Sequence, residues 1–278
     1  MAHTRADHCP GAFAVPHTPH KPARRPGAPA GSTAAATTAK PSSNFASKML
    51  VLVGVVMLGA LLYAGATAGA KPAVALPAPA ADLALGTPTA TATAVFAGGC
   101  FWGVQAVFQH TRGVLNAVSG YAGGTPETAT YPHVSSGKTG HAEAVAITYD
   151  PQVVSYGQLL QIFFSVAHDP TEIDRQGPDY GPQYRSAIFY AHPEEQRVAQ
   201  QYIAQLDATE LLQRKIATTL APLTRFYPAE EEHQDYATRN PHSIYIATYD
   251  RPKITQFQTL MPDRFRETPV LVAGQARQ

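Results

Sequence analysis

A single cysteine in the body of the chain lies where chemistry would favour a reactive thiolate. Only two cysteines occur, Cys9 and Cys100, which is too few for a disulfide framework, and neither has the C-x-x-C spacing of a zinc site. Cys100 follows Gly98 and Gly99, between a segment with strand periodicity and one with helical periodicity. The N–H groups and the dipole at a helix N-terminus lower the pKa of a thiol, and the glycines would leave the sulfur open. The pattern predicts a nucleophile, with an inert buried cysteine as the alternative.

Side chains of two kinds could complete such a site. Phe101 and Trp102 could form an apolar wall for a small methyl-bearing group, or belong to the core. His141 and Glu143 alternate on a predicted strand, so both could face one pocket. Buried among aromatic side chains, Glu143 would have a raised pKa and could hold a proton at neutral pH; the alternative is a solvated strand residue. A His-x-Glu pair also occurs in zinc deaminases, but their P-C-x-x-C ligand pair is absent.

A loop rich in glycine and proline, residues 175–186, supplies further polar candidates. It contains Asp179 and Tyr184 and leads into a predicted strand, and Tyr131 offers a second phenol donor. Loops that lead into strands commonly carry binding residues. Taken one at a time, each of these residues could equally be ordinary turn chemistry.

Hydrophobic periodicity from about residue 92 predicts the elements that must position these side chains. Strand patterns cover residues 91–99, 113–124, 141–150, 185–191 and 215–226. Helical patterns cover residues 101–111, 155–168 with Ser155 as the N-cap, 193–206 and 229–237. The strand–helix–strand–strand–helix–strand order predicts an α+β two-layer sandwich, with a mixed sheet, helices packed on it and a ferredoxin-like core. We expect this domain to cover residues 92–249 and an extended C-terminal tail to cover 250–278.

Three segments of different composition precede that domain. Residues 1–48 are rich in Pro, Ala, Ser and Thr, carry a formal charge of +5 and are predicted to be disordered. Residues 49–70 hold no charge and could span a bilayer, which predicts a transmembrane anchor or the apolar part of a cleaved signal peptide. Residues 71–91 are predicted to be a Pro/Ala linker. Because the basic tail should stay in the cytoplasm, we expect the domain on the extracytoplasmic, periplasmic side.

Five stretches of the chain occur in an order typical of one enzyme family. They are GGCFWG, SGYAGGT, GKTGHAEAV, HDPTEIDRQGPDYGPQYRSAIFY and FYPAEEEHQDY. Over roughly residues 92–242 the chain closely resembles the A-type peptide methionine sulfoxide reductases. GCFWG by itself is moderately specific, whereas all five stretches in one order are highly specific.

The resemblance implies a role for each candidate. Cys100 stands at the position of the family's nucleophile and Glu143 at that of its proton donor. The other positions are the hydroxyl donors Tyr131 and Tyr184, the substrate-binding Asp179, the methyl pocket of Phe101 and Trp102, and His141, which we expect to face the same substrate. The Cys100 thiolate would attack the sulfur of methionine S-sulfoxide, free or in proteins, and end as a sulfenic acid.

The same resemblance implies partners, with two departures from the family pattern. No metal or organic cofactor is needed, and we expect a monomer that uses a thioredoxin-like protein or a small thiol as reductant. Many family members carry later cysteines that resolve the sulfenic acid, but none follows Cys100 here, and Glu232 stands where a tyrosine is common. The formal charge of −4 after residue 48, without clustered Lys or Arg, speaks against a nucleic-acid footprint.

Two other functions fit parts of the pattern. A Cys–His acyl-transfer hydrolase would use His141 as its base, and would need the imidazole in contact with the Cys100 thiol. A non-catalytic, membrane-tethered module that binds oxidised methionine would need neither Cys100 nor Glu143.

Overall fold

The computed structural model describes residues 72–83 and 90–272. The tail predicted over residues 1–48 and the apolar segment predicted over 49–70 lie outside these residues. In the part of the chain that is described, no helix is both long enough and apolar enough to cross a membrane.

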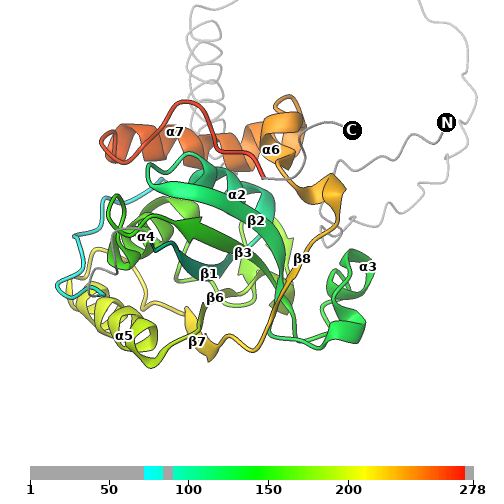
Figure 1. The fold of residues 1–278 in the computed structure, drawn as a ribbon, viewed down its shortest axis with the longest axis horizontal. Coiled ribbons are helices and arrows are strands. Elements are labelled where there is room, and N and C mark those ends of the chain that lie inside the picture. The colour runs from blue at the N-terminus through cyan, green and yellow to red at the C-terminus, as the bar shows by residue number, and fades with distance from the viewer. Residues whose placement is uncertain (1–71, 84–89, 273–278) are drawn as a thin grey trace, which may run out of the picture. The chain divides into compact units, whose positions relative to one another are not determined.

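A six-stranded sheet forms the centre of the domain (Figure 1). Its strands are β1 (Ala92–Gly98), β2 (Val114–Ala122), β3 (Ala142–Tyr149), β6 (Ser186–Tyr190), β7 (Thr219–Pro222) and β8 (Phe226–Pro228), in the order β7-β6-β1-β3-β2-β8. Neighbouring strands run antiparallel except β6 and β7, which are parallel. The predicted α+β class with a mixed sheet is therefore confirmed.

The connection between β7 and β8 requires the sheet to curl. These two strands form opposite edges of the sheet, yet only residues 223–225 separate them. Five strand spacings in a flat sheet would amount to about 24 Å, whereas the chain from residue 222 to residue 226 can reach at most about 14 Å. The side chains on the face enclosed by the curl are mostly small: Val95, Ala97, Ala122, Ala142, Ala144, Ala187 and Phe189.

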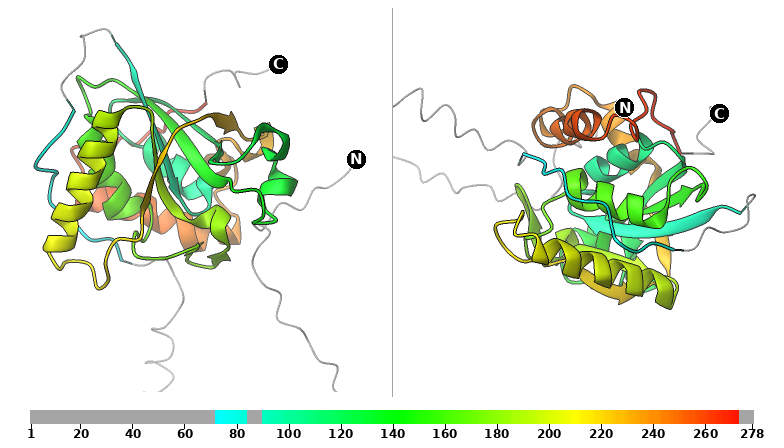
Figure 2. Two further views of the ribbon diagram at one scale, coloured as in Figure 1. Left: turned by 90° about the horizontal axis from the view of Figure 1, so that it is seen from below. Right: turned by 90° about the vertical axis from the view of Figure 1, so that its left-hand side faces the viewer.

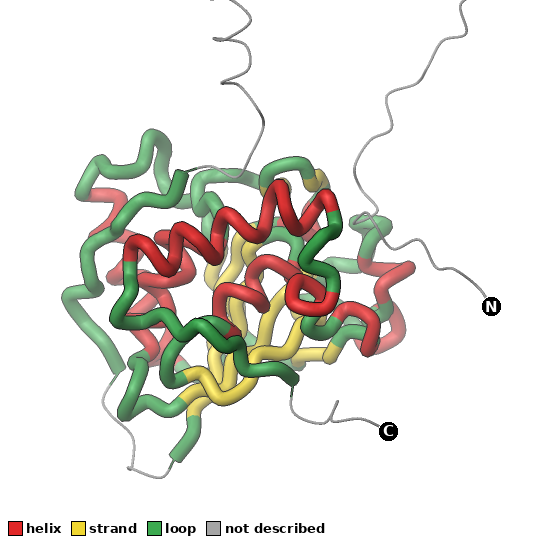
Figure 3. Tube along the Cα trace, turned by 90° about the horizontal axis from the view of Figure 1, so that it is seen from above, coloured by secondary structure: helices red, strands yellow, loops and turns green. Residues whose placement is uncertain are grey.

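The opposite face of the sheet packs against helices. The longer ones are α2 (Phe101–Gln109), α4 (Tyr156–Ile162), α5 (Pro193–Ala208) and α7 (Arg251–Leu260), and both α4 and α7 adjoin a π-helical turn, Phe163–Ala167 and Ile246–Asp250. Ser155 caps α4 as predicted, because it accepts from the N–H of Gln158 while the Gln158 side chain accepts from the N–H of Ser155. Helix α7 packs over α2 (Figure 3), and α5 lies on the opposite side of the domain (Figure 2).

Short elements fill the loops that carry most of the site. They are the helices α3 (Tyr131–Val134) and α6 (Tyr236–Arg239), the hairpin of β4 (Arg175–Gln176) and β5 (Asp179–Tyr180), and the 3₁₀ turns Pro126–Thr128, Pro182–Tyr184 and Glu231–His233. The helix predicted over 229–237 is thus a 3₁₀ turn followed by α6.

The extended tail predicted after residue 250 is wrong, because α7 occupies Arg251–Leu260. Ile254, Phe257 and Leu260 follow one another at intervals of three residues and pack on the core. This short helical pattern is surrounded by polar residues, and the sequence analysis did not recognise it. Beyond α7 the chain stays attached, since the N–H of Val270 donates to the carbonyl of Gln109 at 3.0 Å.

Residues 72–83, inside the predicted linker, lie against α4 and α5. The hydroxyl of Tyr202 donates to the carbonyl of Pro77 at 2.6 Å, and the N–H of Gly157 donates to Asp82 Oδ1 at 2.8 Å. Leu76 is 3% exposed and belongs to the main core. This part of the segment is therefore fixed to the domain by both packing and hydrogen bonds.

Candidate active site

Cys100 lies at the N-cap of α2, directly after the end of β1. Its backbone has φ −50° and ψ 120°, and Gly99 before it has φ +89°, a left-handed conformation that favours glycine. A Cβ atom at Gly99 would lie 2.4 Å from the Cβ of Gln176, so glycine is also required for space. The predicted strand–turn–helix setting is confirmed. Cys100 is only 2% exposed, so its sulfur is more enclosed than the sequence suggested.

Glu143 reaches the same helix start from the central strand β3. Its Oε2 accepts a hydrogen bond from the N–H of Phe101 at 3.0 Å, and the residue is 1% exposed. Burial raises the pKa of Glu143 to about 8; the Phe101 N–H lowers it and the nearby carboxylate of Asp179 raises it. Oε1 is buried and has no hydrogen-bond partner among the described residues. Glu143 is therefore mostly protonated at neutral pH, with an oxygen free to carry the proton.

Trp102 stands at the centre of an aromatic cluster. Its ring stacks on that of Tyr236 at 3.8 Å between centroids and 11° between planes, and meets Tyr245 edge-on at 5.8 Å. Phe101 packs 5.4 Å from the ring of His233. These rings form an apolar, rigid surround beside the start of α2, as an aromatic methyl pocket would need.

The two predicted hydroxyl donors belong to short turns. Tyr131 begins α3, and its N–H donates to Glu230 Oε1 at 2.9 Å, while Glu230 Oε2 accepts from the hydroxyl of Tyr121 at 2.8 Å. The ring of Tyr131 lies 4.1 Å from that of His233. Tyr184 ends a 3₁₀ turn and is fully buried. Glu230 thus fixes where Tyr131 sits, although the two are far apart in the sequence.

Asp179 lies on the hairpin strand β5 and is 1% exposed. Burial raises the pKa of Asp179 to about 6, and this rise is limited by a hydrogen bond that the Tyr245 hydroxyl donates to Oδ2 and by the positive charge of Lys253. Its Oδ1 is buried and has no hydrogen-bond partner among the described residues. Asp179 therefore joins the site to the segment before α7 and keeps one acceptor for a ligand.

His141 has a different environment from the one we predicted. The N–H of Gly124 donates to Nδ1 at 3.2 Å, and Nε2 then donates to the carbonyl of Thr125 at 2.9 Å. Both nitrogens hold the loop that leads to Tyr131, so the ring is not placed as a base for Cys100. In the part of the chain that the structure describes, no three His, Cys, Asp or Glu side chains form a group that could hold a metal ion.

Several residues of the site were missed by the sequence analysis. They are Glu230, His233, Tyr236, Tyr245, Asp250 and Lys253. The first three lie within the stretch FYPAEEEHQDY, whose resemblance to the family could have singled them out. The last three lie beyond residue 242, in or near the predicted tail, where no pattern pointed to a site.

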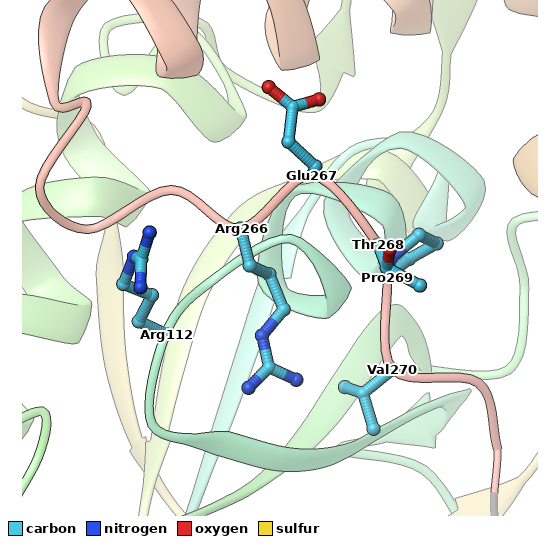
Figure 4. Close-up of a pocket in the computed structure, with 6 residues that line it drawn as sticks. All are labelled: Arg112, Arg266, Glu267, Thr268, Pro269 and Val270. Atoms are coloured by element: carbon cyan, nitrogen blue, oxygen red, sulfur yellow. The ribbon is translucent and has the colours of Figure 1, made fainter.

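A separate hollow lies beside the C-terminal segment. It is lined by Arg112, Arg266, Glu267, Thr268, Pro269 and Val270 (Figure 4). Arg112 donates through Nε to the carbonyl of Phe265 at 2.8 Å, which fixes that side chain to the backbone. None of the predicted site residues lines this hollow.

The chain is similar to known proteins of one family. The family model for peptide methionine sulfoxide reductase matches residues 92–264. The chain is 55% identical over 180 residues to "Peptide methionine sulfoxide reductase MsrA 2" of Mesorhizobium japonicum, covering 65% of this chain and 92% of the relative. A protein of the same name from Synechocystis is 50% identical over 193 residues, covering 69% and 90%.

Among solved structures, the reduced form of Mxr1 from Saccharomyces cerevisiae matches with a TM-score of 0.52 and 32% identity, covering 56% of this chain and 88% of the other. The match of the family model spans every strand of the sheet and every candidate residue of the site. The chain therefore belongs to the peptide methionine sulfoxide reductase family.

Proposed function

We propose that the chain reduces methionine S-sulfoxide, free or in proteins, to methionine, with Cys100 as the nucleophile and Glu143 as the proton donor. The observation that carries this proposal is the buried carboxyl of Glu143, which accepts from the N–H of the residue after Cys100. Family membership supports the reaction, and the A-type relatives support the S epimer.

The first half-reaction transfers one oxygen from substrate to enzyme. The Cys100 thiolate bonds to the sulfoxide sulfur while Glu143 gives its proton to the sulfoxide oxygen. The hydroxyl then passes to the Cys100 sulfur as the bond between the two sulfurs breaks, leaving methionine and a Cys100 sulfenic acid. The methionine sulfur is reduced by two electrons, and the cysteine sulfur is oxidised by two.

Donors and apolar rings around Cys100 suit this step. Attack places negative charge on the sulfoxide oxygen, and donors already in position stabilise that charge most. We assign the hydroxyls of Tyr131 and Tyr184 to this role beside Glu143. The methyl group of the substrate would lie against Phe101 and Trp102, while Asp179 Oδ1 would accept from a donor of the substrate.

Regeneration of Cys100 needs a thiol from outside the domain. No cysteine occurs in residues 101–278, and Cys9 precedes the apolar segment. One external thiol would attack the sulfenic acid, release water and form a mixed disulfide; a second thiol would then free Cys100 as a thiol and leave as a disulfide. A thioredoxin-like protein or a small thiol such as glutathione can supply both.

We also propose that residues 49–70 anchor the chain in a membrane or direct its export, with the domain on the extracytoplasmic side as a monomer. The support is the uncharged run itself and the basic residues that precede it.

A turnover assay tests the proposed reaction. Peptides that contain the separate S and R epimers of methionine sulfoxide are incubated with dithiothreitol, in parallel with an ester substrate. We expect methionine from the S epimer only, no ester hydrolysis, and no product from Cys100→Ser. Ester hydrolysis without methionine would favour an acyl-transfer hydrolase, and binding without turnover would favour a binding module.

A further inference from the structure

A buried ion pair on the C-terminal part of the domain lies against the first turn of α2. Asp250 is completely buried, and its Oδ1 is 3.1 Å from Nζ of Lys253, whose side chain is 18% exposed. The second oxygen, Oδ2, is buried with no hydrogen-bond partner among the described residues. The reaction proposed above uses neither residue.

Gly103 is the residue that lets this pair reach α2. A Cβ atom built on Gly103 would lie 2.1 Å from Oδ1 of Asp250 and 2.8 Å from Nζ of Lys253, so any larger side chain would displace the pair. Cys100 is the N-cap of the same helix, three residues before Gly103, and its negative charge acts on the Lys253 ammonium. The ammonium, held against the first turn of α2, therefore lies within electrostatic range of the Cys100 side chain.

The charges of the site support this placement. Burial alone would lower the pKa of Lys253, but the negative charges of Asp250, Cys100 and Asp179 raise it above its ordinary value. The ammonium therefore stays charged and is attracted by the thiolate form of Cys100.

The other titratable groups around the site include both neutral and negatively charged side chains at pH 7. Burial raises the pKa of Glu143 to about 8 and lowers that of His168, which also senses the charge of Lys253, to about 3. The phenols are Tyr131, Tyr184 and Tyr245. Burial lowers the pKa of His233, which packs on Phe101. Burial would raise the pKa of Glu230, but hydrogen bonds from the Tyr131 N–H and the Tyr121 hydroxyl lower it below its ordinary value, so Glu230 is a further negative charge near Tyr131. Asp179, whose pKa is raised to about 6 mainly by burial, is mostly ionised and repels a thiolate. The positive charge of Lys253 thus partly compensates the negative charges of Asp179 and Asp250 close to the nucleophile.

Stability alone gives a weak reason for such a pair. Removing two charges from water costs about as much as their attraction returns, and apolar side chains of similar size often serve a core equally well. An ammonium beside a thiol, in contrast, lowers the pKa of that thiol and raises the fraction of thiolate.

We propose that Lys253, held in place by Asp250 and admitted by Gly103, is a positioning residue that stabilises the thiolate of Cys100. This inference rests on the proposed function, in which that thiolate is the nucleophile. Lys253 acts through its charge and touches no substrate atom in this scheme.

The test is the pKa of Cys100, measured without any substrate. In the full chain with Cys9→Ser, Cys100 is the only thiol, so its alkylation by iodoacetamide can be followed against pH by mass spectrometry. Lys253→Met should raise the Cys100 pKa by about one unit or more, as expected for a lost opposite charge, and slow alkylation at pH 7 about tenfold. Lys253→Arg keeps the charge and should largely restore the wild-type profile. The exposed Lys215 provides a matched control, because Lys215→Met should change nothing.

Asp250→Asn separates charge from structure. It removes the negative end of the pair but keeps an acceptor for Lys253, so the Cys100 pKa should stay unchanged or fall. If Lys253→Met does not fold, the double variant Asp250→Asn, Lys253→Met removes both buried charges, and its Cys100 pKa should be higher than that of Asp250→Asn alone. The proposal is overturned if Lys253→Met keeps the wild-type profile, if the double variant has the same Cys100 pKa as Asp250→Asn, or if Asp250→Asn and Lys253→Met raise the pKa equally. Wild-type turnover of methionine sulfoxide is measured separately, so failure of the reaction and failure of this role are distinguishable.

Discussion

Replacing Glu143 with glutamine removes the proton donor while keeping nearly the same shape. The amide can still accept from the N–H of Phe101, which is now 3.0 Å from Oε2. A positioned general acid typically contributes about 10²–10⁴ to a rate. We therefore expect Glu143→Gln to lower kcat for methionine sulfoxide by about that factor, with a smaller effect on KM.

The same substitution should stabilise the fold at neutral and alkaline pH. Below about pH 4.5 the carboxyl is protonated in both the folded and the unfolded chain, so its raised pKa has no effect on stability. As the pH rises toward 8, the unfolded chain releases the proton while the folded chain keeps it, so stability falls and then levels off. The pKa shift of Glu143 from 4.5 to about 8 lowers the free energy of unfolding by about 5 kcal/mol above pH 8, and by about 3 kcal/mol at pH 7.

Two measurements on the purified variant check this reasoning. Denaturant unfolding at several pH values between 5 and 9 should show that the stability advantage of Glu143→Gln grows with pH. Glu194→Gln is the matched control, because Glu194 is exposed on α5 and pairs only with nearby Arg197 on the surface. Near wild-type turnover in Glu143→Gln, or an advantage that does not change with pH, would refute the role of a buried, protonated Glu143.

Three further predictions follow from the turn before Cys100, from the cysteines and from the apolar segment. Gly99→Ala should lower the free energy of unfolding by about 2–4 kcal/mol in denaturant, because it combines a left-handed backbone with a clash against Gln176. Gly177 is also left-handed but has open space around it, so Gly177→Ala should lower the free energy of unfolding by less. Equal losses of stability in the two variants would contradict the clash. Cys9→Ser should leave steady-state turnover with dithiothreitol unchanged, whereas lost turnover with a Cys9–Cys100 disulfide in the wild type would show that the tail resolves the intermediate. Alkaline phosphatase fused after residue 272 should be active in a bacterial host, and a silent fusion would contradict the proposed topology.

Local sequence signals predicted the elements whose residues alternate or repeat along a buried face. The strand β3 falls inside its predicted range, the helix α5 begins at the predicted residue 193 and ends two residues beyond the predicted end, and Ser155 caps α4 as expected. The four strands in the order β6-β1-β3-β2 are each antiparallel to their neighbours; the two-layer sandwich and the ferredoxin-like core stay predictions. The curl of the sheet was not predictable in this way, because it depends on a three-residue connection between strands at opposite edges.

In the candidate site, too, the residues that local sequence signals mark were predictable, and those that depend on distant contacts were not. Cys100 and Glu143 were predictable because a glycine pair, a helix start and a strand lie within short stretches. Tyr245 and Lys253 were not. Tyr245 joins the site through a hydrogen bond to Asp179, which is 66 residues away in the sequence, and Lys253 pairs with Asp250 in a segment whose helix the sequence analysis did not recognise. The structure does not support the predicted role of His141 in substrate binding. Both ring nitrogens form hydrogen bonds with backbone groups of a loop that lies 16 and 17 residues away in the sequence.

A single turnover without any reductant tests the central claim most directly. The full chain with reduced Cys100 is mixed with an excess of a methionine S-sulfoxide peptide, and the methionine formed and the state of Cys100 are measured by mass spectrometry. The mechanism predicts one methionine per chain and a sulfenic acid on Cys100 that dimedone traps, with neither product in Cys100→Ser. Methionine formed while Cys100 remains an unmodified thiol, or continued turnover without a thiol, would contradict it.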